Sequence, residues 1–327
     1  LRTALAAACV VSMRGSAAAV LATGDEKRFK YDYRMLPVSR LPQMKEDIDR
    51  LVREKRVSDN ETYRSYIEGR DYGMPEDFPG ARTIISLATA CPMGLVDFHY
   101  RGEKHELVIA PQYFDDGIAA EDLDRVVKEE IIGEGDWRVE RIHGPLQKNL
   151  AVRSGLGRYG RNNIVYVDGM GSFLTLYCYF TDFDPGRDDW GELRMLDECG
   201  SCRICRRTCP TGAIRDDEFV IDAGRCLTLY NEVDGEFPEW IAPGSHNALA
   251  GCMKCQSPCP ANREAKKNTL RLEPVTEEET EKILAGTSDT KLLETLTGKL
   301  KSYYPARSQE YFPIFTRNLG VLLRPEG

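Results

Sequence analysis

The pattern of apolar and polar positions changes period several times over the first 190 residues, as expected of a chain that mixes helices with strands. Met44, Ile48 and Leu51 recur at helical spacing, which predicts a helix over residues 42–55. Asn60 follows shortly after and can cap a second, shorter helix. The helical pattern then gives way to short apolar runs.

These apolar runs predict strands. The run TIISLATA at 83–90 has the composition of a buried strand, and VDFHY and HELVIA alternate as a hairpin around the turn RGEK. The runs RVERI, IVYV and FLTLYCYF predict three more strands. Between them, residues 121–132 predict an amphipathic helix. Its apolar face would hold Leu123, Val126, Val127 and Ile131.

Strands interleaved with helices in this order predict an α/β (or α+β) domain over residues 1–190. Its first residues, LRTALAAACVVSMRG, weakly resemble a secretory signal, but Arg14 interrupts a short, alanine-rich apolar block. We therefore expect a helix to about Met13 and a strand over 17–22, in a cytoplasmic protein. The absence of a starting Met suggests a trimmed or incomplete N-terminus.

From residue 271 onward the pattern becomes purely helical. The stretches TEEETEKILAG, TKLLETLTGKL and YFPIFTRNLGVLL predict three helices, with Leu292, Leu293, Leu296 and Leu300 on one stripe. No strict internal repeat accompanies them. Residues 271–327 are thus expected to form a lone helical docking tail; a fragment of a helical-repeat module is the alternative.

Composition places the chain among globular proteins: it has 327 residues, of which 42% are hydrophobic, and a net charge of −8. No apolar run is long enough to span a membrane. The overall charge argues against a general nucleic-acid binder, but basic residues crowd one segment. They are Arg203, Arg206, Arg207, Arg215, Arg225, Lys254, Arg263, Lys266 and Lys267. Such a cluster can compensate anionic groups, dock an acidic electron donor or meet RNA phosphates.

The cysteines supply the strongest chemical signal, because eight of the eleven lie between Cys199 and Pro260. The first four follow C-x2-C-x2-C-x3-C-P, the run by which bacterial-type ferredoxins hold 4Fe-4S clusters. The proline prevents the chain from continuing as a helix. Zinc sites usually use pairs of cysteines, and disulfide frameworks belong to short secreted chains, so neither alternative fits as well. We predict two 4Fe-4S clusters in a reducing cytoplasm.

Spacing also predicts which cysteine serves which cluster, because the fourth cysteine of such a run joins the other cluster. The first cluster would be held by Cys199, Cys202, Cys205 and Cys259. The second would be held by Cys209, Cys226, Cys252 and Cys255.

The segment before the cysteines resembles a conserved block of a known protein family. Residues 149–182, NLAVRSGLGRYGRNNIVYVDGMGSFLTLYCYFTD, resemble the AGLG-x-x-GKN…GS-x-x-x-L block of the epoxyqueuosine reductases. That block is followed in the family by CGxCxxCxxxCPTxAI, an RC and GCxxCQxxCP, and the same order is present here, including Gln256. Arg161 instead matches the GRN of the related reductive dehalogenases.

The resemblance implies a nitroreductase-like domain that binds cobalamin over residues 1–190, followed by a two-cluster ferredoxin-like domain over 191–270. Independently of it, the glycine turn from Gly155 would let the backbone approach a large cofactor closely. The residues implied for that cofactor are Gly157, Arg158, Tyr159, Gly160, Arg161, Asn162 and Asn163.

The proton donor departs from the family pattern. Counting back from Gly155, the family's acidic donor falls on Arg141, and an arginine stays charged. Glu140, His143 and Tyr159 are the candidate replacements.

These features predict a cobalamin-dependent iron–sulfur reductase that accepts electrons from a ferredoxin or flavodoxin. Its substrate would be a small molecule or a modified nucleoside; the family's tRNA-binding repeats have only the short segment 276–323 as a counterpart, so tRNA is not favoured. Two alternatives stay open: an electron carrier or reactivating partner without cobalamin, and a tRNA-binding protein with structural clusters.

Overall fold

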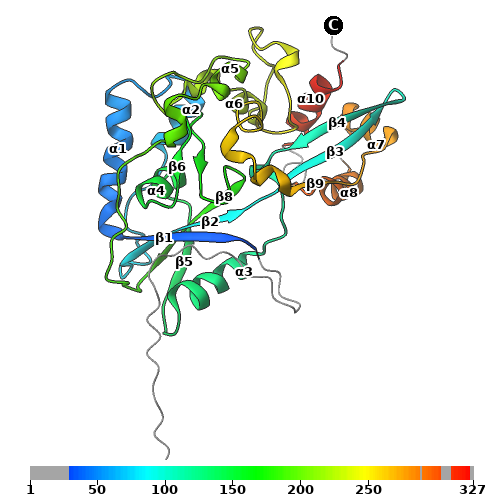
Figure 1. Ribbon diagram of the computed structural model, residues 1–327. Helices are drawn as coiled ribbons and strands as arrows, with labels where there is room; N and C mark the ends of the chain where they lie inside the picture. The colour runs from blue at the N-terminus through cyan, green and yellow to red at the C-terminus, as the bar shows by residue number, and fades with distance from the viewer. Residues whose placement is uncertain (1–28, 288, 303–310, 325–327) are drawn as a thin grey trace, which may run out of the picture.

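The computed structural model describes residues 29–287, 289–302 and 311–324 (Figure 1). At its centre is a four-stranded sheet in the order β1-β2-β8-β5, in which all neighbouring strands are antiparallel. The strands are β1 (Tyr31–Pro37), β2 (Thr83–Ala90), β5 (Val139–Ile142) and β8 (Leu174–Thr181). The predicted strands are confirmed, and the antiparallel order makes the domain α+β. The helix and strand predicted before residue 24 lie outside the described residues.

Helices cover both faces of this sheet because successive strand residues point to opposite sides. On one face, Ile84 and Phe180 pack with the helices α1 and α4. On the other, Ile85 and Tyr179 pack with α3 and its continuation η3. The helices are α1 (Leu41–Arg53), α4 (Gln147–Arg153), α3 (Ala120–Arg125) and η3 (Val126–Ile132). The sheet is therefore the middle layer of three.

The helix predicted over 121–132 is present, but its second half, η3, is a π-helix and not an α-helix. Its buried residues Val126, Val127 and Ile131 are spaced i, i+1 and i+5. That spacing fits the five-residue step of π-helical hydrogen bonding, so the wider turn keeps all three on the sheet.

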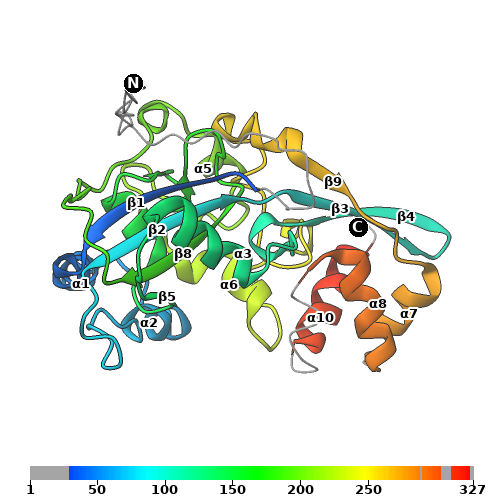
Figure 2. The same cartoon turned by 90° about the horizontal axis from the view of Figure 1, so that it is seen from below.

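The predicted hairpin is formed by β3 (Met93–Tyr100) and β4 (Glu103–Ile109). Arg101 and Gly102 make the turn with positive φ angles of 54° and 75°, which suits a two-residue hairpin loop. A strand that the sequence pattern did not predict, β9 (Thr269–Arg271), pairs in parallel with β3. The hairpin projects beyond the end of the central sheet (Figures 1 and 2).

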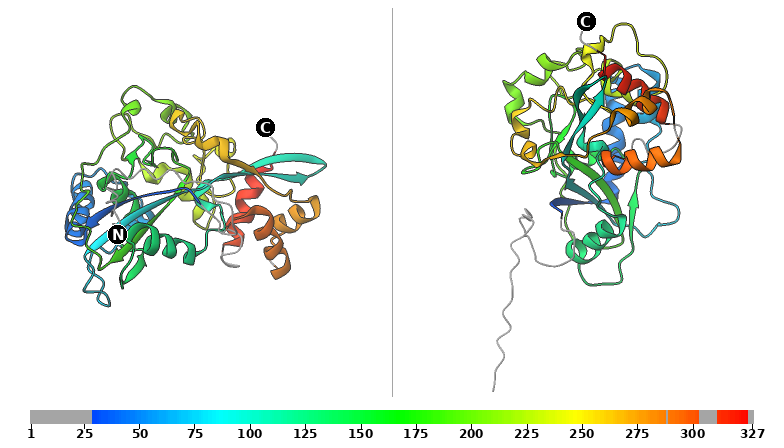
Figure 3. Two further views of the ribbon diagram at one scale, coloured as in Figure 1. Left: turned by 60° about the horizontal axis from the view of Figure 1, so that its bottom comes forward. Right: turned by 90° about the vertical axis from the view of Figure 1, so that its right-hand side faces the viewer.

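The three predicted C-terminal helices are confirmed as α7 (Glu277–Leu284), α8 (Thr290–Leu300) and α10 (Phe312–Leu322). They pack along one side of the hairpin (Figures 2 and 3). Phe98 and Leu107 of the hairpin share one buried core with Leu296 and Phe315 of the helices. The segment therefore packs on the hairpin and forms one hairpin–helix unit with it.

The cysteine-rich segment lies above the sheet and consists mainly of loops and short helices (Figure 1). Next to it lies α2, capped as predicted by Asn60, whose side chain accepts a hydrogen bond from the Tyr63 amide. The remaining elements are α2 (Glu61–Glu68), β6 (Arg158–Tyr159), β7 (Val165–Tyr166), α5 (Ile204–Thr208) and α6 (Leu227–Glu232). Within the described ranges, no helix has both the length and the apolar character needed to cross a bilayer.

Candidate functional site

The sulfur atoms of the eight predicted ligands interact in two groups. Cys199 and Cys205 interact electrostatically with each other and with Cys202 and Cys259. We call these four the first quartet. Cys205 lies on α5, which ends at Thr208 just before Cys209-Pro210, as the proline requires.

The second quartet consists of Cys209, Cys226, Cys252 and Cys255. The sulfur of Cys255 interacts with the other three, and that of Cys252 with Cys226 and Cys209. The grouping is the same as that predicted from spacing, with Cys209 crossing over from the first run. Four thiols per group is the donor set that a 4Fe-4S cluster requires. Which sulfurs bind iron stays a prediction that this arrangement supports.

The other two described cysteines are structural. Cys91 and Cys178 are buried among apolar side chains, and burial raises the pKa of both thiols. Cys178 belongs to the core between the sheet and α1, away from either quartet.

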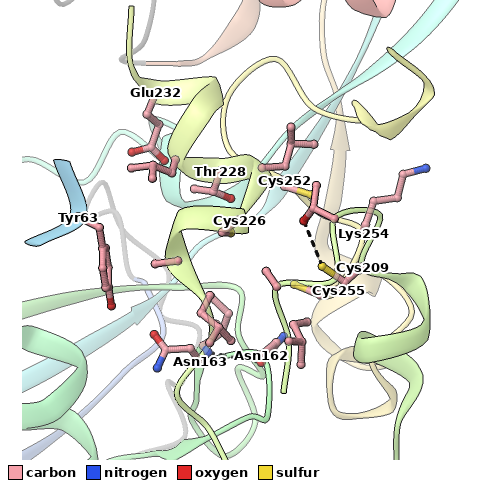
Figure 4. Close-up of a pocket in the computed structure, with 18 of the residues that line it drawn as sticks. Tyr63, Asn162, Asn163, Cys209, Cys226, Thr228, Glu232, Cys252, Lys254 and Cys255 are labelled. Atoms are coloured by element: carbon pink, nitrogen blue, oxygen red, sulfur yellow. Dashed lines mark hydrogen bonds between the residues drawn. The ribbon is translucent and has the colours of Figure 1, made fainter. Parts of the chain in front are cut away.

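A cavity of about 380 Å³ opens between the cysteine-rich segment and the α+β layers. All four cysteines of the second quartet line it (Figure 4). Tyr63 and Glu232 face it from the other side, and Asn162 and Asn163 from the glycine-rich block. Apolar residues supply most of its remaining wall, including Ile164, Pro210, Ile214, Ile221, Leu227 and Val233.

Two charged side chains of this cavity were not singled out from the sequence. Burial lowers the pKa of the Lys148 amine to about 8, partly offset by the nearby Cys226 thiol, and this amine donates hydrogen bonds to the main-chain and side-chain oxygens of Asn163. Burial raises the pKa of the Glu232 carboxyl to about 7, and that carboxyl accepts a hydrogen bond from the Tyr113 hydroxyl. A lysine on a helix carries no local signal of such a position, because the cavity forms only in the tertiary structure.

The glycine turn is explained by the packing of the protein against itself. A Cβ at Gly157 would lie 2.6 Å from Val165 Cγ1, and one at Gly160 would lie 2.5 Å from the Tyr166 ring. Gly155 has a φ of +73°, which favours glycine. The expectation that these glycines approach a cofactor is therefore not needed to explain them.

The other residues implied for cobalamin also have partners within the protein. Arg158 is half-exposed and pairs with Asp168 at 3.0 Å. Tyr159 is buried and stacks on Phe219 with ring centroids 4.3 Å apart. Of the seven implied residues, only Asn162 and Asn163 line the cavity.

Arg161 is turned toward the first quartet. It is only 2% exposed, and its Nη2 donates to the carbonyl oxygen of Cys199. Its Nε and Nη1 have no hydrogen-bond partner among the described residues. A buried guanidinium in this state is costly unless a negative group lies beside it.

A buried amide network fastens the cysteine-rich segment to the sheet. The Ser172 hydroxyl donates to Gln256 Oε1 at 2.8 Å, and the Asn262 amide donates to both Ser172 Oγ and the Gln256 carbonyl. A side chain at Gly171 would collide with Asn262. The Gly-Ser pair and Gln256, noted as motif residues, thus hold the second cysteine loop in place.

The three candidate proton donors do not converge. Glu140 lies on the edge strand β5 and forms a hydrogen bond with Arg138 Nε at 2.7 Å. His143 is exposed, and Tyr159 lies in a core where burial raises its pKa. None of the three lines the cavity, and Arg141 is exposed on β5.

Comparison with known proteins agrees with the cysteine pattern. Residues 198–262 match the model of the 4Fe-4S double cluster binding domain. The epoxyqueuosine reductase of Atelocyanobacterium thalassa is 35% identical over 130 residues, which cover 38% of this chain and 41% of that protein. The resemblance stated from the sequence is therefore confirmed, and the chain carries a two-cluster domain. The match spans about two fifths of the length of that relative.

Solved structures extend the likeness to the fold. Epoxyqueuosine reductase from Streptococcus thermophilus superposes with a TM-score of 0.60 at 20% identity, covering 89% of this chain and 76% of that one. An epoxyqueuosine reductase in complex with an epoxyqueuosine-modified stem loop of tyrosine tRNA superposes with a TM-score of 0.59 at the same identity and coverage. The predicted mixed fold is confirmed by this match.

Proposed function

We propose that this protein is a cytoplasmic iron–sulfur reductase that relays electrons through two 4Fe-4S clusters to a bound cobalamin. The observation that carries the proposal is the gathering of eight cysteines into two quartets, the second of which lines a cavity shared with the α+β layers. A ferredoxin or flavodoxin would supply the electrons, docking on the basic residues around the cysteines. The nitroreductase-like character of the first domain and the domain limits 190 and 270 belong to the same proposal.

Cobalamin would supply a low-valent cobalt that carries out the reduction. Its corrin rim bears carboxamides and its nucleotide tail a phosphate. The Lys148 amine, the Asn163 amide and the Tyr63 hydroxyl would meet part of that surface, because a cavity of about 380 Å³ beside the second quartet has room for only an edge of so large a cofactor. Together with Asn162 from the predicted set, these are the cavity residues that would hold it. The apolar wall would exclude water from the reacting centre.

The substrate proposed is a modified nucleoside, because the relatives are epoxyqueuosine reductases and one of them was solved with a modified tRNA stem loop. Glu140, His143 and Tyr159 stay the predicted proton donors, although none of them lines the cavity.

The test is metal analysis of protein purified without oxygen and reconstituted with iron, sulfide and cobalamin. We expect about eight irons and one cobalt per chain, with turnover of epoxyqueuosine in a tRNA stem loop. Lys148→Met is expected to weaken cobalt retention while leaving the iron content unchanged. Eight irons with no cobalt uptake would overturn the cobalamin assignment.

One observation favours a second function. Because the glycine-rich block faces the protein and the quartets, the chain could act as an electron carrier or reactivating partner without cobalamin. In that case, the reconstituted protein would reduce an acceptor protein at full rate in the absence of cobalt.

A further inference from the structure

We propose that Arg161, Asn162 and Tyr166 form a hydrogen-bonding strap that touches both quartets and sets the reduction potentials of the two clusters. All three side chains are at most 3% exposed. The inference rests on the two-cluster part of the proposed function and not on cobalamin. Because the three residues lie within six positions of the chain, one short segment would control both redox centres.

The strap contacts the first quartet at two points. The main-chain amide of Arg161 interacts with the sulfur of Cys199, and its guanidinium donates to the carbonyl oxygen of the same residue. The two unpartnered nitrogens of Arg161 leave a positive, hydrogen-bonding surface buried at this quartet. At the second point, the Tyr166 hydroxyl interacts with the sulfur of Cys259.

Asn162 connects this arrangement to the second quartet. Its Nδ2 donates to the Tyr166 hydroxyl at 3.1 Å, and its side chain also interacts with the sulfur of Cys255 across the cavity wall. A carboxamide nitrogen carries two hydrogens, so one amide can serve both groups. The path from Cys259 through Tyr166 and Asn162 to Cys255 therefore joins the two quartets.

The electrostatic consequence follows from the charge of the clusters. A 4Fe-4S centre with four thiolates is anionic, and reduction by one electron adds a further negative charge. Hydrogen bonds to the ligand sulfurs and a buried cation stabilise the reduced state more than the oxidised state, which raises the potential. Arg161 and Tyr166 would act mainly on the first cluster, and Asn162 on the second.

The experiment is a redox titration of reconstituted full-length protein with mediators, in which electron paramagnetic resonance follows each reduced cluster. Tyr166→Phe deletes only the hydroxyl and is expected to lower the potential of the first cluster. Arg161→Gln is expected to lower the same potential further, by about tenfold in the reduction equilibrium, or about 59 mV for one electron. Asn162→Ala is expected to lower the potential of the second cluster.

Arg194→Gln is the matched control, since this arginine is 71% exposed and its contact with Glu192 is long, at 3.8 Å. Iron content is measured for every variant, and if Arg161→Gln loses iron, the isosteric Tyr166→Phe decides the outcome. If the variants retain all their iron and their cluster potentials equal that of the control, the proposal that the strap sets the potentials is wrong. The titration does not require cobalt. Its result therefore stands even if the protein does not bind cobalamin.

Discussion

At the scale of single residues, Cys255 and Cys259 separate the two quartets most sharply, because they are close in sequence but interact with different partners. Cys255→Ala is expected to remove about four irons and the signal of the second cluster. The double variant with Cys252→Ala should lose no more, whereas the double variant with Cys259→Ala should lose both clusters. Iron analysis measures the iron content of each variant, and electron paramagnetic resonance shows which cluster remains.

Cys178→Ala serves as the control for these variants, since its thiol is buried in an apolar core. It is expected to retain all iron. If the two double variants lost the same amount of iron, the assignment of Cys259 to the first quartet would be wrong.

Glu232 gives a prediction about pH. Burial raises its pKa in the folded protein from 4.5 to about 7, so between these values the unfolded chain releases a proton that the folded chain retains. Stability therefore falls as pH rises from 4.5 to 7, and the full cost is present at pH 8. Glu232→Gln should raise stability at pH 8 by up to about 3 kcal/mol.

The measurement is denaturant unfolding of the wild type and Glu232→Gln at pH 8 and pH 5. Glutamine keeps an oxygen that accepts from Tyr113, so the comparison isolates the charge. The gain should shrink toward zero at the lower pH; an equal gain at both values would contradict the role of the carboxylate.

The sequence predicted the cysteine quartets because ferredoxin-type spacing is a local pattern. It did not predict Tyr166 as a contact of the quartets, since a tyrosine in the run IVYV is indistinguishable from a core residue of a strand. Lys148 was missed for a similar reason, and Arg161 was assigned to a cofactor although its side chain turns toward Cys199. Contacts between distant segments decide all three roles.

At the scale of elements, a buried ion pair joins α1 to α4. Arg153 Nε donates to Asp47 Oδ2 at 2.7 Å, and Asn149 donates to the same oxygen at 3.3 Å. Asp47→Ala would leave the guanidinium of Arg153 without its carboxylate partner, and we expect a loss of about 3–5 kcal/mol in unfolding free energy.

Asp49→Ala on the same helix is the control, because its pair with Lys45 is exposed on the surface. Its effect should stay below about 0.5 kcal/mol. The unfolding free energies are measured by chemical denaturation. If both variants lost the same amount, the buried Asp47–Arg153 pair would contribute no more than an exposed pair.

The helices and long strands could be predicted because each has a regular pattern of apolar residues along the chain. The strand β2, for example, spans the same residues as predicted. Two features escaped it. The three residues of β9 carry no periodic signal, and their partner β3 lies far away in sequence. The π-helical turn of η3 depends on packing against the sheet, which local propensity does not describe.

At the scale of the whole molecule, the C-terminal helix α10 is attached to the helix that follows Cys226. The Asn318 amide donates to the carbonyls of Asn231 and Leu249, at 2.9 and 3.0 Å. Asn318→Leu would leave both carbonyls buried without this donor, at a cost of about 1–3 kcal/mol each. We expect faster loss of iron from the second cluster than from the first.

The check is the rate of iron release to a chelator, followed separately for the two clusters by their spectroscopic signals. Glu294→Gln, at an exposed position of α8, is the control and should release iron at the wild-type rate. Equal acceleration of both clusters would indicate general unfolding and contradict a specific attachment.

The hairpin of β3 and β4 also has a consequence for biosynthesis. Its apolar side chains are covered by helices that the ribosome makes much later, after the cysteine-rich segment. At usual elongation rates, this delay lasts roughly ten to forty seconds. During that time Phe98 and Leu107 are not yet buried by α8 and α10. The nascent chain therefore exposes an apolar surface to which a chaperone can bind.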